Sequence, residues 1–141
     1  MNRLIYCSQA THGLSPEELV SLLEIARKNN KQRGLSGMLL YASQSFLQLI
    51  EGNEVQLEVT YRAIQRDKRH TNLRLLINHA VSERMFPDWT MGFEDVNDEQ
   101  LALELEGFTP AIEYPLVNSN LVTNSVIAET LLRLYSKNRE R

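Results

Sequence analysis

Gln48 is the residue whose chemistry departs most from its surroundings in this sequence. It lies in the run FLQLI at residues 46–50, where the other four side chains are apolar. If this run is a central β-strand, the amide is removed from water, and a buried amide without a hydrogen-bond partner costs about 1–3 kcal/mol. Either the protein or a bound ligand must therefore supply the partners of Gln48.

Four other polar side chains are candidates for the same site. They are Tyr6 in the apolar N-terminal run, Asn30 after the first expected helix, and Arg69 and His70 at the end of the basic run RDKRH at residues 66–70. Taken singly, each fits an ordinary structural role: a core tyrosine, a polar turn, or cations at the negative end of a helix. Together they would border one cleft between two helices, and such a cleft suits a planar ligand with amide-like donors and acceptors.

Other kinds of chemistry find little support in the sequence. The three histidines, His12, His70 and His79, lie far apart, with no cysteine or acidic residue at zinc-binding spacing. No glycine-rich phosphate loop follows an expected strand. Nothing in the spacing of Cys7, Ser8 and His70 supports a nucleophile with its base. The residues thus favour a binding pocket over a metal site or a covalent catalyst.

Capping signals and hydrophobic periodicity predict the elements that position these residues. Ser15, Pro16 and Glu18 open the first helix with a capping box. Asn53 and Gln56 open the second in the same way. The expected elements are a strand at 3–8, a helix at 16–28, a hairpin at 35–52 that turns at 42–45, a helix at 53–66, a strand at 73–81, a strand at 89–93, a short acidic helix at 99–106 and a last helix after Asn120.

The order of these elements predicts an α+β fold of the ferredoxin-like class. The order is β-α-β-β-α-β-β, and its first six elements match the split βαβ arrangement, in which the first and third strands lie centrally in a mixed sheet. Two helices would cover the face that carries Tyr6 and Gln48, and the C-terminal helices would cover the other face. We therefore expect one domain over residues 1–95 and a helical extension over residues 96–141.

Composition narrows the class of protein. The net charge of −3 argues against a dedicated nucleic-acid binder, and no apolar run reaches the ~20 residues that cross a bilayer. Cys7 is the only cysteine, so no internal disulfide can form, and the N-terminus lacks the apolar core of a signal peptide. A cytoplasmic protein that contacts neither membrane nor nucleic acid is the expectation.

The motifs that carry these residues closely resemble those of the BLUF domain, a family of blue-light sensors that use flavin. The matching segments are RLIYCSQA at 3–10, ARKNN at 26–30, GLSGMLLY at 34–41, FLQLIEG at 46–52, D-x-RH at 67–70 and R-x-F-x-x-WTMGF at 84–93. They occur in the family's order and span about two-thirds of the chain. Ser36 stands where threonine is common and Ile50 where leucine is common, and neither change removes a functional group.

The resemblance implies a non-covalently bound FAD, flanked by the two helices, and it assigns roles to single residues. Tyr6 would donate an electron and a proton to the excited flavin, and Gln48 would bridge Tyr6 and the ring and then rearrange. A glutamine suits this role because it presents a donor or an acceptor from one place. The other cofactor-binding residues would be Leu22, Asn30, Phe46, Ile64, Asp67, Arg69 and His70, and the signal relay would be Trp89 and Met91.

The expected function is a non-enzymatic blue-light photoreceptor that self-associates. The chain has no room for a cyclase or phosphodiesterase domain, so output is expected to pass to a separate signalling protein. Two other functions stay open: a light-independent small-ligand or protein-interaction module on a ferredoxin-like fold, and a small hydrolase of acylphosphatase-like topology. The hydrolase would need an anion-binding loop, and the loop after Ser8 lacks the expected glycines.

Overall fold

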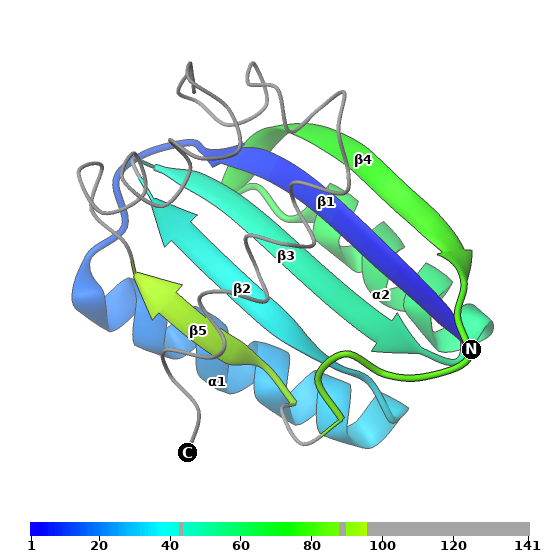
Figure 1. Ribbon diagram of the computed structural model, residues 1–141. Coiled ribbons are helices and arrows are strands. Elements are labelled where there is room, and N and C mark those ends of the chain that lie inside the picture. The colour runs from blue at the N-terminus through cyan, green and yellow to red at the C-terminus, as the bar shows by residue number, and fades with distance from the viewer. Residues whose placement is uncertain (43, 88–89, 96–141) are drawn as a thin grey trace, which may run out of the picture.

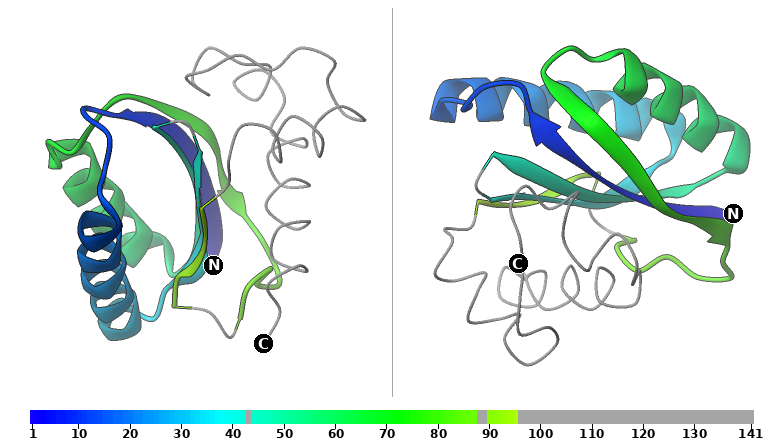
Figure 2. Two further views of the ribbon diagram at one scale, coloured as in Figure 1. Left: turned by 90° about the vertical axis from the view of Figure 1, so that its left-hand side faces the viewer. Right: turned by 90° about the horizontal axis from the view of Figure 1, so that it is seen from above.

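Two helices pack on one face of a five-stranded sheet in the computed structural model, which describes residues 1–42, 44–87 and 90–95 (Figure 1). Both helices lie on the same side when the molecule is turned (Figure 2). In chain order the elements are β1 (Asn2–Ala10), α1 (Pro16–Arg33), β2 (Ser36–Ala42), β3 (Ser45–Gly52), α2 (Glu54–Arg66), β4 (His70–Ala80) and β5 (Gly92–Asp95).

The strand order, β4-β1-β3-β2-β5, places β1 and β3 in the interior of the sheet, as predicted. The first four strands pair antiparallel with their neighbours, and β5 runs parallel to β2, which makes the sheet mixed. This arrangement confirms the ferredoxin-like α+β class. The two C-terminal helices expected at 99–106 and after Asn120, and the extension over 96–141, lie outside the described residues.

Helix α1 begins as its sequence predicts and ends later. Ser15 accepts a hydrogen bond from Glu18 N at 3.1 Å, and the Glu18 carboxylate accepts one from Ser15 N at 3.1 Å, which completes the capping box. The prediction that the helix ends at residue 28 and that Asn30 follows it is wrong. The helix continues for more than a turn and stops at Gly34, whose φ of 69° is the left-handed conformation that favours glycine. Asn30 is therefore a helical residue, and its side chain is buried.

The basic run after α2 is divided between three structures. Asn53 caps the start of this helix by accepting from Val55 N and Gln56 N. The helix ends at Arg66, the next three residues form the connection, and His70 already belongs to β4. The prediction that residues 66–70 end the helix is thus correct only for Arg66. The reason is that Asp67 takes an extended conformation, with a ψ of 121°.

The last two strands also differ from their predicted bounds. Strand β4 starts three residues before the expected 73, and its pairing with β1 has two irregularities. It is an edge strand, and its Leu75 is 47% exposed. Strand β5 covers Gly92–Asp95 rather than 89–93. Trp89, predicted to begin it, lies outside the described residues.

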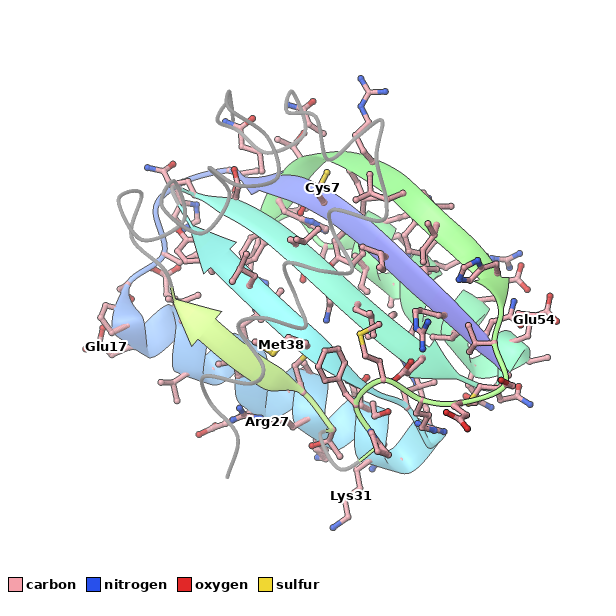
Figure 3. The ribbon with its side chains drawn as sticks, viewed as in Figure 1. Cys7, Glu17, Arg27, Lys31, Met38 and Glu54 are labelled. Atoms are coloured by element: carbon pink, nitrogen blue, oxygen red, sulfur yellow. The ribbon has the colours of Figure 1, made fainter. Side chains whose placement is uncertain are left out.

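The sheet face that points away from the helices is buried too. Ile5 and Cys7 of β1 and Leu47 and Leu49 of β3 are fully shielded from solvent, and they alternate with the side chains that face the helices. Figure 3 shows Cys7 on β1 in this view of the sheet. Burial raises the pKa of the Cys7 thiol to about 11, and the nearby Arg74 offsets part of this rise. The thiol therefore stays protonated and unreactive at neutral pH.

A buried carboxylate joins β3 to the segment that leads to β5. Glu51 is fully buried and accepts hydrogen bonds from Arg3 Nε at 3.1 Å and from Phe86 N at 2.7 Å. Arg84 donates to Ser36 Oγ at 2.8 Å and to Gly34 O at 2.7 Å. These contacts dock the connection between β4 and β5 onto the sheet.

We expect Glu51→Ala to lower the free energy of unfolding by about 3 kcal/mol, because it leaves the Arg3 charge without its buried partner. Denaturant unfolding measures the loss. Glu58→Ala is the control, since Glu58 pairs with Arg62 at a site where both side chains are more than 60% exposed. That change is expected to cost under about 0.5 kcal/mol. Equal losses for the two variants would contradict a structural role for the Glu51 contacts.

Candidate functional site

A cavity of about 150 Å³ lies between α1, α2 and the sheet. It is lined by all nine residues that the sequence placed at the cofactor: Tyr6, Leu22, Asn30, Phe46, Gln48, Ile64, Asp67, Arg69 and His70. Its floor is buried, because Tyr6 is 5% and Gln48 6% exposed. Its rim is open to solvent, because Ile25 is 51% exposed and the Arg69 side chain 40%.

The pairing of β1 with β3 brings Tyr6 and Gln48 together at the floor. The two residues are directly opposite each other in the antiparallel register, so their side chains share one face of the sheet. The Tyr6 hydroxyl donates a hydrogen bond to Gln48 Oε1. This contact satisfies the buried carbonyl that made Gln48 conspicuous in the sequence.

Burial also sets the protonation of Tyr6. Loss of water around the hydroxyl is the main cause that raises its pKa far above the ordinary value, and the negative charge of Asp67 adds to the rise. The hydroxyl is therefore protonated at any physiological pH and acts as the donor toward Gln48. The hydroxyl can release this proton only when the phenol ring of Tyr6 is oxidised.

Met91 contacts the other end of the Gln48 amide. Gln48 Nε2 donates to Met91 Sδ at 3.5 Å, and Met91 is 2% exposed just before β5. Sulfur is a weak acceptor, so this hydrogen bond holds the amide only loosely. The second amide hydrogen of Gln48 has no acceptor within the part of the chain that the structure describes.

Two side chains of α1 hold the backbone next to Met91. Asn30 Nδ2 donates to Thr90 O at 2.6 Å, and Arg27 Nε donates to Met91 O at 2.9 Å. Figure 3 shows Arg27 on α1 next to β5. The Asn30 side-chain oxygen, Oδ1, accepts no hydrogen bond from the described residues, although Asn30 is only 3% exposed. A buried oxygen of this kind at a cavity wall is ready to accept a hydrogen bond from a ligand.

Asp67 and Arg69 form a tight ion pair at the rim. Arg69 donates from Nε at 3.0 Å and from Nη2 at 2.6 Å to the carboxylate, and its backbone N donates to the same group at 2.9 Å. The hydrogen bond from the Arg69 side chain is the largest cause that lowers the pKa of Asp67, and the same bond raises the pKa of Arg69. The pair presents almost no net charge to the cavity.

The lowered pKa of Asp67 predicts an acid-sensitive contribution to stability. Because its folded pKa lies below the unfolded value of about 3.9, this contribution is complete above that pH and is lost as the pH falls through the folded pKa. We expect Asp67→Asn to lower the free energy of unfolding at pH 7 by less than about 1 kcal/mol, since the pair is partly exposed. Urea unfolding at pH 7 and pH 3 tests this, and a difference between the proteins that widens toward acid would contradict it.

His70 ties three elements together from the cavity wall. Its Nε2 lies 2.6 Å from Ile64 O, and its Nδ1 lies 2.8 Å from Ser8 Oγ. A carbonyl only accepts, so Nε2 carries a proton, and in the neutral ring Nδ1 accepts from the Ser8 hydroxyl. Ser8 is fully buried and no carboxylate contacts the ring in these hydrogen bonds, so the pair has a structural role rather than that of a nucleophile.

Several cavity residues were not found from the sequence, and α1 contributes most of them. Ile25, Ala26, Asn29 and Arg33 line the cavity together with Leu22 and Asn30. The signal that could have found them is helical spacing: positions 22, 26, 29, 30 and 33 lie on one face of a helix once it is known to reach residue 33. Strand β2 adds Leu39, and α2 adds Thr60 and Ala63.

Two further properties concern the described residues alone. Neither α1 nor α2 is both long and apolar enough to cross a membrane. Within residues 1–42, 44–87 and 90–95, no group of three or more histidine, cysteine, aspartate or glutamate residues is placed to hold a metal ion.

Comparison with known proteins places this architecture among light sensors. Residues 1–92 match the family model "BLUF: Sensors of blue-light using FAD". The photoactivated adenylate cyclase subunit alpha of Euglena gracilis is 37% identical over 93 residues, which cover 64% of this chain and 9% of the cyclase. The blue light- and temperature-regulated antirepressor BluF of Escherichia coli (strain K12) is 35% identical over 85 residues, which cover 60% of this chain and 21% of that protein.

Solved structures agree over more of the chain. The photo-activated state of BlsA matches with a TM-score of 0.76 and 28% identity, covering 95% of this chain and 94% of that one. The dark-state structure of BlrB, a BLUF protein, matches with a TM-score of 0.74 and 25% identity, covering 96% of each chain. The chain thus spans a small part of its curated relatives and nearly the whole of these two solved chains.

Proposed function

The chain belongs to the BLUF family, so residues 1–92 form a flavin-binding sensor of blue light, and we propose that its cofactor is FAD, held without a covalent bond in the cavity between α1 and α2. The observation that carries this proposal is the buried hydrogen bond from Tyr6 to Gln48 at the cavity floor. It joins the Tyr6 phenol to the Gln48 amide, which can present either a donor or an acceptor, next to the cavity that would hold the ligand.

The cavity fits a flavin ring in its chemistry. Its walls carry the apolar side chains of Leu22, Phe46 and Ile64, which suit the two faces of a planar aromatic ring. Among the described residues, the floor offers an amide hydrogen of Gln48 that has no acceptor, and the side wall offers the side-chain oxygen Oδ1 of Asn30. A flavin presents acceptors and an N–H donor along one edge, so these two groups can each be satisfied.

Bound flavin would supply the absorption of blue light and, once excited, an acceptor for an electron and a proton. We assign the donor role to Tyr6, whose hydroxyl already has its proton on a hydrogen bond to Gln48 Oε1. That bond gives the proton a direct way out when the ring is oxidised, because proton transfer needs donor and acceptor within hydrogen-bond reach. Asp67, Arg69 and His70 would hold the cofactor from the rim.

Gln48 would be the switch. In the geometry seen here its oxygen faces Tyr6 and its nitrogen faces Met91. Rotation or tautomerisation of the amide would turn a donor toward Tyr6 without moving the backbone. Rotation would also end the Met91 contact, because a thioether sulfur can only accept a hydrogen bond. Two arrangements of one side chain with different partners make a bistable element that light can bias.

Met91 would carry the change away from the cavity. Its sulfur contacts Gln48, and its carbonyl is held by Arg27 of α1, so a new orientation of the amide would reach the start of β5 directly. Trp89 lies outside the described residues, and its part in the relay stays a prediction.

We propose that a signalling effector receives the output, since photoactivated adenylate cyclases are among the relatives. We further propose that the effector is a separate protein and that the chain itself lacks enzymatic activity. We also propose that the chain self-associates and resides in the cytoplasm.

The light-independent alternatives are disfavoured by the family match and by the fit of the cavity floor. Absorption spectroscopy of the purified full chain tests the proposal. We expect a yellow protein whose visible flavin band shifts slightly to the red under blue light and returns in the dark. A chain that stays colourless after incubation with FAD would rule the proposal out.

A further inference from the structure

Arg33 is a cation at the cavity to which the photochemistry above gives no role. It lies in the last turn of α1, is partly exposed and lines the cavity. Its Nη1 donates a hydrogen bond to Thr60 Oγ1 at 2.8 Å, which reaches across from α1 to α2. This contact fixes the guanidinium group between the two helices.

The charge of Arg33 is not neutralised by the residues around it. None of the ion pairs of the described residues includes Arg33, whereas Arg69, the other arginine of the cavity, shares its charge with Asp67 at 2.6 Å. The partner of Arg33 is a neutral hydroxyl. A guanidinium has five N–H donors, and the Thr60 contact uses one of them. Charge and donors therefore remain for an anion.

The ends of the cavity differ in what they can hold. The floor at Tyr6 and Gln48 is almost fully buried, and a phosphate placed there would lose its hydration at great cost. The rim is open to water at Ile25 and Ala63. A ligand that places a planar ring against Gln48 must therefore leave any phosphate toward the rim. Of the two arginines that line the cavity in the described part of the chain, Arg33 is the one without a carboxylate partner.

We propose that Arg33, held by Thr60, is a phosphate-binding residue that makes the cavity favour flavin nucleotides over riboflavin. The inference rests on the proposed function, because it takes the ring of a flavin to occupy the floor. Arginine suits the task, since its fork of donors matches the oxygens of a phosphate and remains charged at every physiological pH.

Affinity for three ligands tests the inference in the full chain freed of flavin. Riboflavin, FMN and FAD share the ring, and riboflavin lacks phosphate. We expect Arg33→Gln to weaken FMN and FAD about tenfold, equal to about 1.4 kcal/mol, and to change riboflavin by less than about twofold. Arg33→Lys should restore part of the loss. Quenching of flavin fluorescence on binding measures all three ligands.

Lys31 supplies the matched control. It is another basic residue of the last turn of α1, it is exposed, and it does not line the cavity (Figure 3). Lys31→Gln should leave all three affinities unchanged. If Arg33 only fastens the helices together, Arg33→Gln will weaken riboflavin as much as FMN, and this result would overturn the inference.

Salt gives a test on the unmodified chain, which does not depend on the folding of a variant. Raising ionic strength screens a charge–phosphate contact at an exposed rim, so FMN affinity should fall and riboflavin affinity should stay constant. Equal responses of the two ligands would contradict a phosphate contact. A chain that binds none of the three would instead refute the proposed function itself, so the two failures are distinct.

Discussion

Tyr6→Phe is expected to bind flavin nearly as well as the unchanged protein and to form no red-shifted state under blue light. The substitution keeps the ring that packs in the core and removes only the hydroxyl that donates to Gln48. Without this group neither the proton nor its hydrogen bond is present. A positioned proton donor contributes a factor of about 10²–10⁴, so the yield of the shifted state should fall below about 1% of the original.

Difference absorption spectra recorded before and after a blue pulse measure this yield. Tyr61→Phe is the matched control, because the Tyr61 ring lies 6.1 Å from that of Tyr6 and its loss tests whether a second phenol is the donor. Tyr61→Phe should keep the photocycle. A normal red shift in Tyr6→Phe, or its loss in Tyr61→Phe, would show that the donor has been assigned to the wrong tyrosine.

The sequence could predict the floor of the site because strand pairing follows from local signals. The run around Gln48 is apolar on both sides, and the turn before it fixes a hairpin, so β3 and its register are largely determined by nearby residues. The split βαβ order then makes β1 and β3 neighbours, which brings Tyr6 to Gln48. Both steps rest on periodicity and element order, the strongest signals in a single sequence.

The walls were harder to predict, because they depend on where α1 stops. Two consecutive asparagines suggest a helix end, since their side chains compete for the backbone. The fold overrides this preference by burying Asn30 and giving its amide the Thr90 carbonyl as a partner. That partner is 60 residues away in sequence. No local pattern identifies it, and the same holds for the contacts of Arg27 with Met91 and of Arg33 with Thr60.

Gln48→Leu is expected to abolish the red shift as completely as Tyr6→Phe does, for a different reason. Leucine fills a similar volume in the buried strand but has neither donor nor acceptor. The Tyr6 hydroxyl keeps its proton and loses the oxygen that accepts it, and Met91 loses its contact with the amide. Light would still excite the flavin, and Tyr6 would still be able to donate an electron to it. No amide would remain, however, to change its hydrogen bonds.

Gln9→Leu controls for the substitution itself. Gln9 lies on β1 and accepts from Asn72 Nδ2 at 3.2 Å, and it does not line the cavity, so its photocycle should be normal. Stability separates a lost switch from a lost fold. Gln48→Leu leaves one buried hydroxyl without an acceptor, which costs about 1–3 kcal/mol, and gains apolar burial that offsets part of this cost. The variant should therefore stay folded and yellow. A folded, flavin-loaded Gln48→Leu protein that still shifts to the red would mean that the spectral change arises elsewhere than at this amide.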